Sequence, residues 1–566
     1  MDYWKTIISW IIENKPDKDT LSKHKVRLCK EHGMQKIPTD IEIYMHADKK
    51  DAPLVRKYIE TKPTRTGSGV AVVATMTKPF DCPHGSCTFC PGGLNSAFGN
   101  TPKSYTGHEP STMRGMRNAF DAYRIVFNRL EQYIAIGQNP DKVDQIVMGG
   151  TFCAFHPKYQ KDYIYNSFKA YNDFSRLFFK DGELDIDAFR TFFELPGPVG
   201  DSERGKKITE KILALKTQNV RSLEEEHEEN ENSAIRCIGL TIETKPDWGF
   251  LEHGLRCLEL GATRIELGIQ TVYDEVLRVT NRGHTIEDTK KSIAELRDLG
   301  FKLNFHIMPG LPGEDGKRIS RERDLESIKT IFEDEAFKPD MAKIYPCMVM
   351  PGTQLEKDYR EGIFNPLSAE EAGDIIVEGF KYIPEWCRVM RIQRDIPTFA
   401  IVDGVERTNL RQYVSDLAKK RGVVLRDIRA REVKQIIPQE KPKLVVREYK
   451  ASGGKEYFIA MEAEDTLFGF VRLRIPPRSL HPVITEKSAL IRELHVYGSA
   501  VAIGKHDGNV QHKGLGKQLM EKAEAIALAE GKNKMIVISG VGVRGYYRKI
   551  GYEFERPYMV KYLDKS

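Results

Sequence analysis

Apolar segments with the character of strands alternate with helical segments through residues 69–390. Each of six apolar segments is followed by a stretch in which apolar residues recur at helical spacing: VAVVATM, QIVMGG, IRCIGLTIE, TRIELGIQ, KLNFHIMPG and MAKIYPCMV. Strands that alternate with helices form a parallel sheet, because each helix carries the chain back along the sheet. We therefore predict an α/β fold with a partial TIM-like (βα)6 barrel, whose functional side chains lie at the carboxyl ends of the strands.

Two segments differ from this alternation. Residues 1–68 begin with apolar residues at helical spacing and continue with several lysines and an arginine, which predicts a small helical module that is basic on one side. A solvated helical cap on the barrel is the alternative. The residues concerned are Trp4, Ile7, Ile8, Ile11 and Ile12, followed by Lys23, Lys25, Arg27 and Lys30. Near 181–234, the run EEEHEENENS predicts a solvated loop inserted at the barrel rim.

The window 388–448 is strongly basic, with 15 Lys or Arg against 8 Asp or Glu. Its local charge of +7 exceeds the net charge of +6 for the whole chain. We interpret residues 391–442 as a basic linker. Arg426, Arg429 and Arg431 are candidates for binding phosphate, and a solvated connecting surface is the alternative.

The last part of the chain has a different pattern. Four successive strands, LVVREY, EYFIAMEA, LFGFVRLRI and LIRELHVYG, precede a helix from about Gly516 to Glu530. The strand KMIVISGV and the segment RGYYRKIGYEF follow. This order predicts a separate α+β domain over residues 443–566.

The composition excludes several classes of protein. Hydrophobic residues make up 40% and charged residues 30%, which is typical of a globular protein. No apolar run approaches the roughly 20 residues of a membrane span, and we find no secretory signal, so we expect a cytoplasmic protein without membrane contact. The chain has nine cysteines, an odd number that is thinly spread, and this argues against a disulfide framework. Clustered cysteines are better explained by metal binding or catalysis.

Three cysteines do cluster, as Cys82-Pro-His84-Gly-Ser-Cys87-Thr-Phe-Cys90, directly after the first barrel strand. Three thiolates on a short loop can hold three irons of a cubane cluster and leave the fourth iron open to chemistry, whereas most electron-transfer clusters use four cysteines. A zinc site is the alternative. Zinc needs a fourth Cys or His at matching spacing, and no second CxxC pair follows.

This loop resembles that of the radical S-adenosylmethionine (SAM) superfamily, with the pattern C-x3-C-x2-C and an aromatic residue before the last cysteine. Phe89 matches the aromatic position, but the first gap here has four residues. Gly149-Gly150-Thr151, after the strand QIVM, resembles the glycine-rich contact to the SAM amino group, where glycine permits close backbone approach. The resemblance implies a 4Fe-4S cluster with SAM on its open iron, and Cys82, Cys87 and Cys90 as metal ligands.

A second motif, Gln511-His-Lys-Gly514-Leu-Gly516, opens the predicted C-terminal helix. Backbone N–H groups at such a turn can bind pyrophosphate. With its flanking strands, the motif resembles acetyltransferases of the GNAT type. The resemblance implies an acetyl-CoA site made of Glu493, Leu494, His495 and Val496 for the pantetheine arm, Leu515, Gly516 and Lys517 for the pyrophosphate, and Tyr547 near the thioester. A purely structural role in the core is the alternative for Tyr546 and Tyr547.

Together, the segments CTFCPGG, SYTGHEPSTMRGMR, IVMGGTF, GLTIETKPD, RIELGIQTVYDEV, TNRGHT, RIQRDIP, RELHVYGS and ISGVGVRGYYRKIGY closely resemble the family of Elongator catalytic subunits. The resemblance covers about residues 70–566, apart from the insertion. It implies a tRNA-modifying enzyme in which a deoxyadenosyl radical removes hydrogen from the methyl group of acetyl-CoA. The acetyl radical then adds to carbon 5 of the wobble uridine, and thioester hydrolysis leaves 5-carboxymethyluridine.

The family also implies partners and further contacts. These are a tRNA anticodon stem-loop, an electron donor and, as candidates, accessory subunits of the Elongator type. The N-terminal module and the basic window would bind tRNA. Lys142 would contact acetyl-CoA from the barrel side, although a solvated lysine at that position is an equal alternative. Gln270, Arg282 and Lys343 are weaker candidates for cofactor or substrate contacts.

Two rival functions remain open at this point. A protein lysine acetyltransferase with a structural iron–sulfur cluster would explain the C-terminal motif but would leave the open iron unused. A tRNA-binding scaffold without chemistry would leave both intact motifs unexplained.

Overall fold

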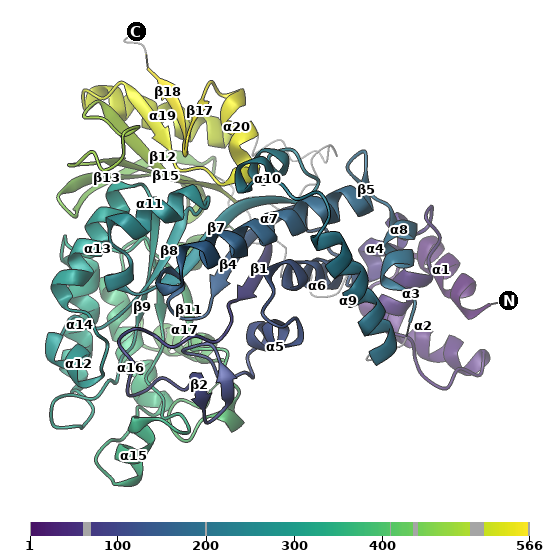
Figure 1. Ribbon diagram of the computed structural model, residues 1–566, viewed down its shortest axis with the longest axis horizontal. Helices are drawn as coiled ribbons and strands as arrows, with labels where there is room; N and C mark the ends of the chain where they lie inside the picture. The colour runs from purple at the N-terminus through teal and green to yellow at the C-terminus, as the bar shows by residue number, and fades with distance from the viewer. Residues whose placement is uncertain are drawn as a thin grey trace. The chain divides into compact units, whose positions relative to one another are not determined.

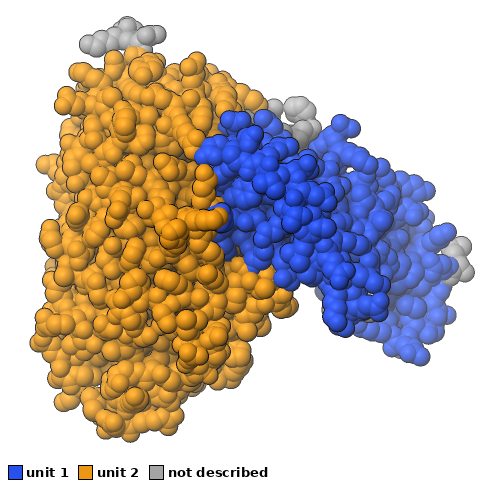
Figure 2. All heavy atoms as spheres, viewed as in Figure 1, with its two compact units in different colours: residues 1–73, 121–144, 162–238 blue, residues 74–120, 145–161, 239–566 orange. Residues whose placement is uncertain are grey.

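The computed structural model describes residues 2–59, 69–197, 201–407, 409–433, 440–497 and 514–563. Its contacts divide it into two compact units, shown in different colours in Figure 2. The first comprises residues 1–73, 121–144 and 162–238, and the second comprises residues 74–120, 145–161 and 239–566. Gln511, at the start of the predicted pyrophosphate turn, lies outside the described residues, whereas Gly514 and Gly516 lie within them.

The first sheet is a seven-stranded partial barrel with the order β1-β4-β7-β8-β9-β10-β11 (Figure 1). Pairing from β7 through to β11 is parallel, as predicted from the alternation of strands and helices. The six predicted strands are confirmed, and one strand was missed. The strands are β1 (Ala71–Met76), β4 (Lys142–Met148), β7 (Arg236–Thr244), β8 (Arg264–Gln270), β9 (Lys302–Ile307), β10 (Met341–Ile344) and the unpredicted β11 (Arg388–Ile392).

Helices follow the strands of the second unit and bury the outer face of the barrel. Ile242, Ile265, Leu303 and Phe305 alternate with polar residues along β7, β8 and β9, and all four are at most 1% exposed. The helices are α5 (Pro110–Arg117), α11 (Leu251–Glu259), α12 (Asp274–Val279), α13 (Ile286–Asp298), α14 (Arg321–Glu333), α15 (Gln354–Arg360), α16 (Ala369–Gly379) and α17 (Leu410–Lys420). A small hairpin, β2 (Gly93–Ser96) and β3 (Gly99–Thr101), follows the cysteine loop.

The second large sheet has the order β12-β13-β14-β15-β16-β18-β17. Its pairing is antiparallel except between β15 and β16. The predicted C-terminal strands and helix are confirmed, with α19 packed on β13, β14 and β15. The elements are β12 (Lys443–Ala451), β13 (Gly454–Ala463), β14 (Thr466–Ile475), β15 (Ser488–Val496), α19 (Leu515–Ala529), β16 (Lys534–Val537), α20 (Arg544–Lys549), β17 (Glu553–Glu555) and β18 (Tyr558–Tyr562).

Within the second unit, this sheet lies at the amino ends of the barrel strands. Figure 1 shows β12–β18 at one end of the barrel and α12, α15 and β2 at the opposite end. Buried ion pairs hold the two sheets together. Arg492 donates to both carboxylate oxygens of Asp340, at 2.6 and 2.7 Å, and Arg474 donates to Asp298 at 2.9 Å. Arg472 donates to the Trp386 carbonyl at 2.7 Å.

The first unit is largely helical. In the N-terminal part, the ring of Trp4 stacks on His46 with a centroid distance of 3.6 Å. Lys25, predicted on the basic surface, is buried and paired with Asp40 at 2.9 Å, so the exposed basic residues are Lys23, Arg27 and Lys30. The helices are α1 (Tyr3–Asn14), α2 (Lys18–Glu31), α3 (Asp40–His46), α4 (Ala52–Ile59), α6 (Ala122–Ala135), α7 (Pro157–Phe178), α8 (Ile186–Phe193), α9 (Ser202–Lys216) and α10 (Leu223–Asn230). Helix α7 begins in the second unit.

The acidic run was wrongly predicted to be a solvated loop. It forms helix α10, which Ser222 and Glu225 cap reciprocally. Glu226 is fully buried and accepts a hydrogen bond from the Asn172 amide at 2.7 Å. The prediction failed because acidic residues near a helix N-terminus favour the helix, and one of them has an internal partner.

The basic window also differs from its prediction as a linker. Residue 391 lies inside β11, and α17 packs against α16. Its three candidate phosphate ligands have protein partners: Arg426 pairs with Glu385 at 2.7 Å, and Arg429 donates to the Met390 carbonyl. Arg431, 4% exposed, pairs with Glu462 at 2.8 Å. Arg426 and Arg431 therefore pair with carboxylates of the fold, and Arg429 bonds to the backbone.

This correction gives a matched pair of variants. Arg431→Ala should lower the free energy of unfolding by about 1–3 kcal/mol, because it removes a buried guanidinium that pairs with Glu462 and Asp465 and leaves Glu462 with Arg447 as its remaining partner. Arg426→Ala should change it by less than about 1 kcal/mol, since the Arg426 side chain is 55% exposed. Urea unfolding followed by circular dichroism measures both. Equal losses for the two variants would contradict the structural role of Arg431.

Among the described residues, none of the helices combines the length and the hydropathy that crossing a membrane requires.

Candidate active site

The three clustered cysteines line a cavity of about 130 Å³ in the second unit. Cys82, Cys87 and Cys90 enter it from the loop after β1. The remaining lining comes from the carboxyl ends of the barrel strands and the loops that follow them, as predicted for functional residues of a barrel. The three low-priority candidates Gln270, Arg282 and Lys343 line the same cavity.

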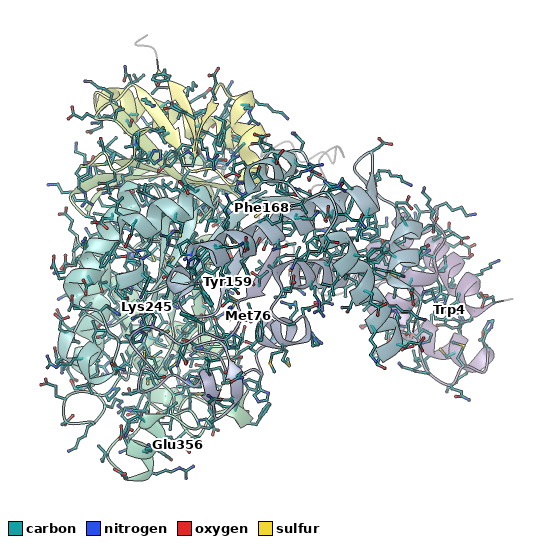
Figure 3. The ribbon with its side chains drawn as sticks, viewed as in Figure 1. Trp4, Met76, Tyr159, Phe168, Lys245 and Glu356 are labelled. Carbon is teal, nitrogen blue, oxygen red and sulfur yellow. The ribbon has the colours of Figure 1, made fainter. Side chains whose placement is uncertain are left out.

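Hydrogen-bond donors surround two of the sulfur atoms. Arg282 Nη1 lies 3.3 Å from Cys87 Sγ, and the Ser104 backbone N–H donates to Cys90 Sγ at 3.2 Å. Lys245, labelled in Figure 3, places its ammonium 3.0 Å from His84 Nδ1. Because an ammonium can only donate, His84 accepts at Nδ1 and donates from Nε2 to Cys87 Sγ, 3.4 Å away.

Burial at this site favours neutral side chains when no metal is bound. Burial, reinforced by Lys245 and Arg282, lowers the pKa of His84 to about 3, so the ring is neutral. Burial raises the pKa of the Cys82 thiol and of the Cys90 thiol. A metal that binds here must therefore displace thiol protons, and the nearby N–H donors then stabilise the thiolates.

The predicted glycine pair lies beside the cysteines, where side chains would not fit. Gly149 and Gly150 have φ angles of 135° and 95°, in the range that favours glycine. A Cβ on Gly149 would lie 1.9 Å from Thr77 Oγ1, and one on Gly150 would lie 3.1 Å from Lys103 Cβ. Gly150 and Thr151 line the cavity, so their backbone is open to a bound molecule.

The floor of the cavity is a buried group of charged and polar side chains. Lys343 forms an ion pair with Glu266 and lies 3.8 Å from Glu243. His306 Nε2 lies 2.9 Å from the same Glu266 carboxylate, and Tyr105 donates to Glu243 at 2.9 Å. Burial alone would disfavour both charges, but the Lys343 ammonium lowers the pKa of Glu266, and Glu266 raises that of Lys343.

The candidate acyl-CoA residues assemble in the C-terminal sheet. Strand β15 pairs with β16 only as far as Ile491, whereas it pairs with β14 as far as Val496. The segment Glu493–Val496 therefore diverges from β16, as the GNAT resemblance predicts. A Cβ on Gly516 would lie 2.9 Å from Tyr546 Oη and 3.7 Å from Val496, so the first turn of α19 lies beside this divergence.

The individual side chains differ in exposure. Leu515 is buried, whereas Lys517 is exposed and pairs with Glu521, so the backbone N–H groups of this turn are the better ligands for pyrophosphate. Tyr547 is 6% exposed and packs in the core, where burial raises its pKa. Tyr546 is 38% exposed and faces Gly516, which makes it a contact that the sequence did not distinguish.

His495 and Glu493 lie at the end of β15. His495 packs against Tyr497, and burial lowers its pKa to about 4, which keeps the imidazole neutral. Glu493 accepts from Arg472 Nε at 2.8 Å. Lys142 is the first residue of β4 and belongs to the first unit.

A substitution in the first turn of α19 tests the acyl-CoA site. Gly516→Glu should reduce acetyl-CoA affinity at least about 100-fold, because the side chain meets Tyr546 and its carboxylate opposes the pyrophosphate. Isothermal titration calorimetry measures the affinity. Gly531→Asn, at the other end of α19 with open space around it, is the matched control and should bind normally. Unchanged affinity for Gly516→Glu would remove this turn from the site.

Several site residues escaped the sequence analysis. His84, Lys103, Tyr105, Glu243, Lys245, Glu266, His306, Arg391 and Arg394 contribute to the cavity or its floor. One signal for these residues is present in the sequence. Polar or charged residues alternate with apolar ones inside the predicted strands, as in TIET, RIEL and NFHI. Such residues face the inside of a barrel when their neighbours face the helices.

The chain matches family models along most of its length. Residues 1–67 match the ELP3 N-terminal domain, 79–325 the radical SAM superfamily, 339–420 the Radical_SAM C-terminal domain and 425–552 the acetyltransferase (GNAT) family. The radical SAM family implies an iron–sulfur cluster and SAM, and the GNAT family implies an acyl-CoA. The three thiols, the N–H donors around them and the open glycine backbone fit such a cluster with a ligand beside it.

Full-length relatives share this organisation. The chain is 40% identical to the tRNA uridine(34) acetyltransferase of Methanocaldococcus jannaschii, over 99% of this chain and 98% of the relative. It is 37% identical to human Elongator complex protein 3, over 98% and 96%. A solved structure of Methanocaldococcus infernus Elp3, with an N-terminal deletion, superposes with a TM-score of 0.70 at 37% identity, covering 88% of this chain and all of that one. This protein therefore belongs to the Elp3 family, whose members combine a radical SAM domain with a GNAT domain.

Proposed function

We propose that this protein converts the wobble uridine of tRNA to 5-carboxymethyluridine, using a 4Fe-4S cluster, SAM and acetyl-CoA. The observation that carries the proposal is the cavity around Cys82, Cys87 and Cys90 in a chain that also contains the acyl-CoA strand and turn. A cluster held by three thiolates leaves one iron for a ligand, and the cavity provides room for that ligand.

Each part of the cavity has a role in this proposal. The three cysteines hold the cluster. The backbone at Gly150 and Thr151 binds the polar end of SAM, and Gln270 lies where a ribose can be bound. Arg282 and Lys103 supply positive charge for a carboxylate. When bound, the cluster and SAM supply a carbon-centred radical that removes hydrogen from the acetyl methyl group.

The C-terminal residues bind and orient the acyl donor. Backbone N–H groups of Leu515, Gly516 and Lys517 bind the pyrophosphate, and the divergence at Glu493–Val496 receives the pantetheine arm. Tyr547, with Tyr546 beside it, closes the pocket near the thioester.

An RNA loop is the substrate that suits the cavity. Its lining includes Arg391 and Arg394, which can neutralise phosphates. Phe399, three residues after the lining residue Ile396, is 77% exposed and lies beside His108, and exposed aromatic rings stack on unpaired bases. The N-terminal module, with Lys23, Arg27 and Lys30 exposed, is the second surface for tRNA.

A protein lysine acetyltransferase with a structural cluster would leave two features of the structure unexplained. A structural cluster requires no cavity beside its ligands and no buried charged floor, whereas both are present. The purified protein, reconstituted anaerobically with iron and sulfide, is the test. Incubation with SAM, acetyl-CoA, a reductant and tRNA should give 5-carboxymethyluridine on nucleoside mass analysis. Acetylation of lysine in added protein without any change in tRNA would favour the alternative.

A further inference from the structure

The inside of the barrel is polar at every layer that the register defines in β7, β8 and β9. Pairing places Thr241 beside Arg264 and Arg264 beside Lys302, which forms the layer nearest the amino ends of the strands. The next layer places Glu243 beside Glu266 and Glu266 beside Asn304. In an ordinary TIM barrel, bulky branched residues fill these layers.

The uppermost layer opens into the cysteine cavity. His306 pairs in register with Lys343, and both line the cavity together with Gly268 and Glu243. Successive residues of a strand point to opposite faces. The residues two and four positions before those of the uppermost layer therefore also face the barrel interior. The intervening residues, such as Ile242, Ile265 and Leu303, are buried on the outer face.

The lowest layer reaches the acyl-CoA strand. Arg492, next to Glu493 on β15, donates to the Phe301 carbonyl at 2.9 Å, and Phe301 directly precedes Lys302. Lys302 is the first residue of β9, at the end of the barrel against which the C-terminal sheet packs. The lowest interior layer therefore lies against β15, and the uppermost layer lies at the cavity.

Two interior side chains have unused hydrogen-bonding atoms. Thr241 and Asn304 are each 0% exposed, and Thr241 Oγ1 and Asn304 Oδ1 have no partner among the described residues. The Asn304 amide nitrogen donates to Glu266 at 3.0 Å. This bond fixes the orientation of the side chain and leaves its oxygen without a hydrogen-bond donor. Buried polar atoms without partners are rare and indicate a place where water or a ligand binds.

We propose that the barrel interior is the route by which the acyl arm of acyl-CoA reaches the cysteine cavity. This inference rests on the proposed function, because it assumes that the acyl donor binds at β15 and reacts at the cavity. A pantetheine arm carries two amides and a hydroxyl group, which match the donors and acceptors of Thr241 and Asn304. Gly268 leaves space at the upper layer, where a side chain would meet Arg282 and Gln270.

Lys343 closes this route in the present structure. Its ammonium lies between Glu266 and Glu243, below the cavity, and must move aside to let the acyl group pass. A lysine suits this role because its charge sits on a flexible four-carbon chain and can exchange one carboxylate for the other. Glu243 and Glu266 come from neighbouring strands, so both stay in place while Lys343 moves.

The first experiment locates the acyl arm without any cluster chemistry. An acyl-CoA analogue with a photoreactive diazirine in its acyl chain is irradiated with the wild-type protein lacking iron and SAM, and peptides are mapped by mass spectrometry. We expect crosslinks on the interior residues of β7, β8 and β9, including Thr241 and Asn304. Crosslinks confined to residues outside the barrel interior would overturn the proposal.

The second experiment blocks the route. Thr241→Leu adds bulk to the lowest interior layer, and Ile242→Leu is the matched control on the outer face. With methyl-deuterated acetyl-CoA, deuterium appearing in 5′-deoxyadenosine should fall about 100-fold in Thr241→Leu, because displacement of reacting atoms by an ångström can have this effect. Binding of adenosine 3′,5′-bisphosphate, which occupies only the α19 end, should be unchanged. The control should match the wild type.

The outcomes separate the two proposals. Normal deuterium transfer by folded Thr241→Leu would overturn the interior route and leave the proposed function intact. Absence of deuterium transfer in the reconstituted wild type would overturn the proposed function, while the crosslinks still report where the acyl arm lies. If Thr241→Leu does not fold, the wild-type crosslinks alone decide the route.

Discussion

Cys87→Ser is expected to abolish iron binding, SAM cleavage and tRNA carboxymethylation, while acetyl-CoA affinity stays normal. Cys87 Sγ is the sulfur that both Arg282 and His84 contact, so this ligand is positioned from two sides. A serine hydroxyl is a poor replacement because iron–sulfur clusters are held by thiolates, which are soft and anionic. The acyl-CoA turn belongs to a separate core and should keep its fold.

The measurements are iron content, 5′-deoxyadenosine production, tRNA nucleoside analysis and calorimetric titration of acetyl-CoA. Cys29→Ser provides the matched control, since Cys29 is also buried but lies in α2 and outside the cavity. It should retain iron and activity. SAM cleavage by an iron-free Cys87→Ser protein would rule out a role for this cluster in the chemistry.

Arg492→Met is expected to lower the free energy of unfolding by about 3–5 kcal/mol, because removing one arginine from a buried charge network leaves its two carboxylate partners with too little positive charge. Arg492 is 0% exposed and donates to Asp340 and Glu456, which are 1% and 0% exposed. Both carboxylates would remain buried, with Arg472 as the remaining partner of Asp340 at 3.6 Å and Arg474 as that of Glu456 at 2.8 Å. The loss should appear as a lower urea midpoint for the second unit.

Two comparisons identify the cause of that loss. Arg478→Met removes a guanidinium that also pairs with a buried carboxylate, Asp298, but the Arg478 side chain is 41% exposed, and the effect should be much smaller. Adding Asp340→Leu and Glu456→Leu to Arg492→Met removes the two carboxylates that lost this arginine and should recover part of the stability. If the Arg492→Met variant were as stable as the wild type, the ion pairs of Arg492 would contribute nothing to stability.

The regular elements could be predicted because their signals are local. The six barrel strands and helix α19 have apolar residues at the spacing that each structure requires, and burial in the fold agrees with that spacing. The divergence of β15 from β16 was also expected, although only through family resemblance.

The misread segments depend on partners far away in the sequence. Strand β11 contains two arginines, Arg388 and Arg391, among its five residues, and it forms by pairing with β10. Arg431 looks like a surface cation until Glu462, on β13, is placed beside it. Helix α10 looks solvated until Asn172, on α7, is placed against Glu226.

The candidate site divides in the same way. Short motifs contain Cys82, Cys87, Cys90 and the glycine pair, and the spacing within each motif is enough to predict a function. Glu243, Glu266 and Lys343 come from three strands. They can be recognised as site residues only when the register of the strands brings them together. Sequence alone also left Tyr546 and Tyr547 equivalent, whereas the fold buries one and places the other against Gly516.

The buried arginines that join the two sheets limit how this protein can be rearranged by recombination or engineering. Arg472, Arg474 and Arg492 belong to the acyltransferase half, yet their counter-charges and carbonyl partners include residues of the barrel. A transplanted acyltransferase domain without these three arginines would remove the pairs that Arg472 and Arg492 make with Asp340 and would leave Asp298 with the partly exposed Arg478 alone. The isolated C-terminal half would instead expose three arginines on strands built for burial. The two halves can therefore be exchanged between proteins only as a matched pair, with both sides of this charge network inherited together.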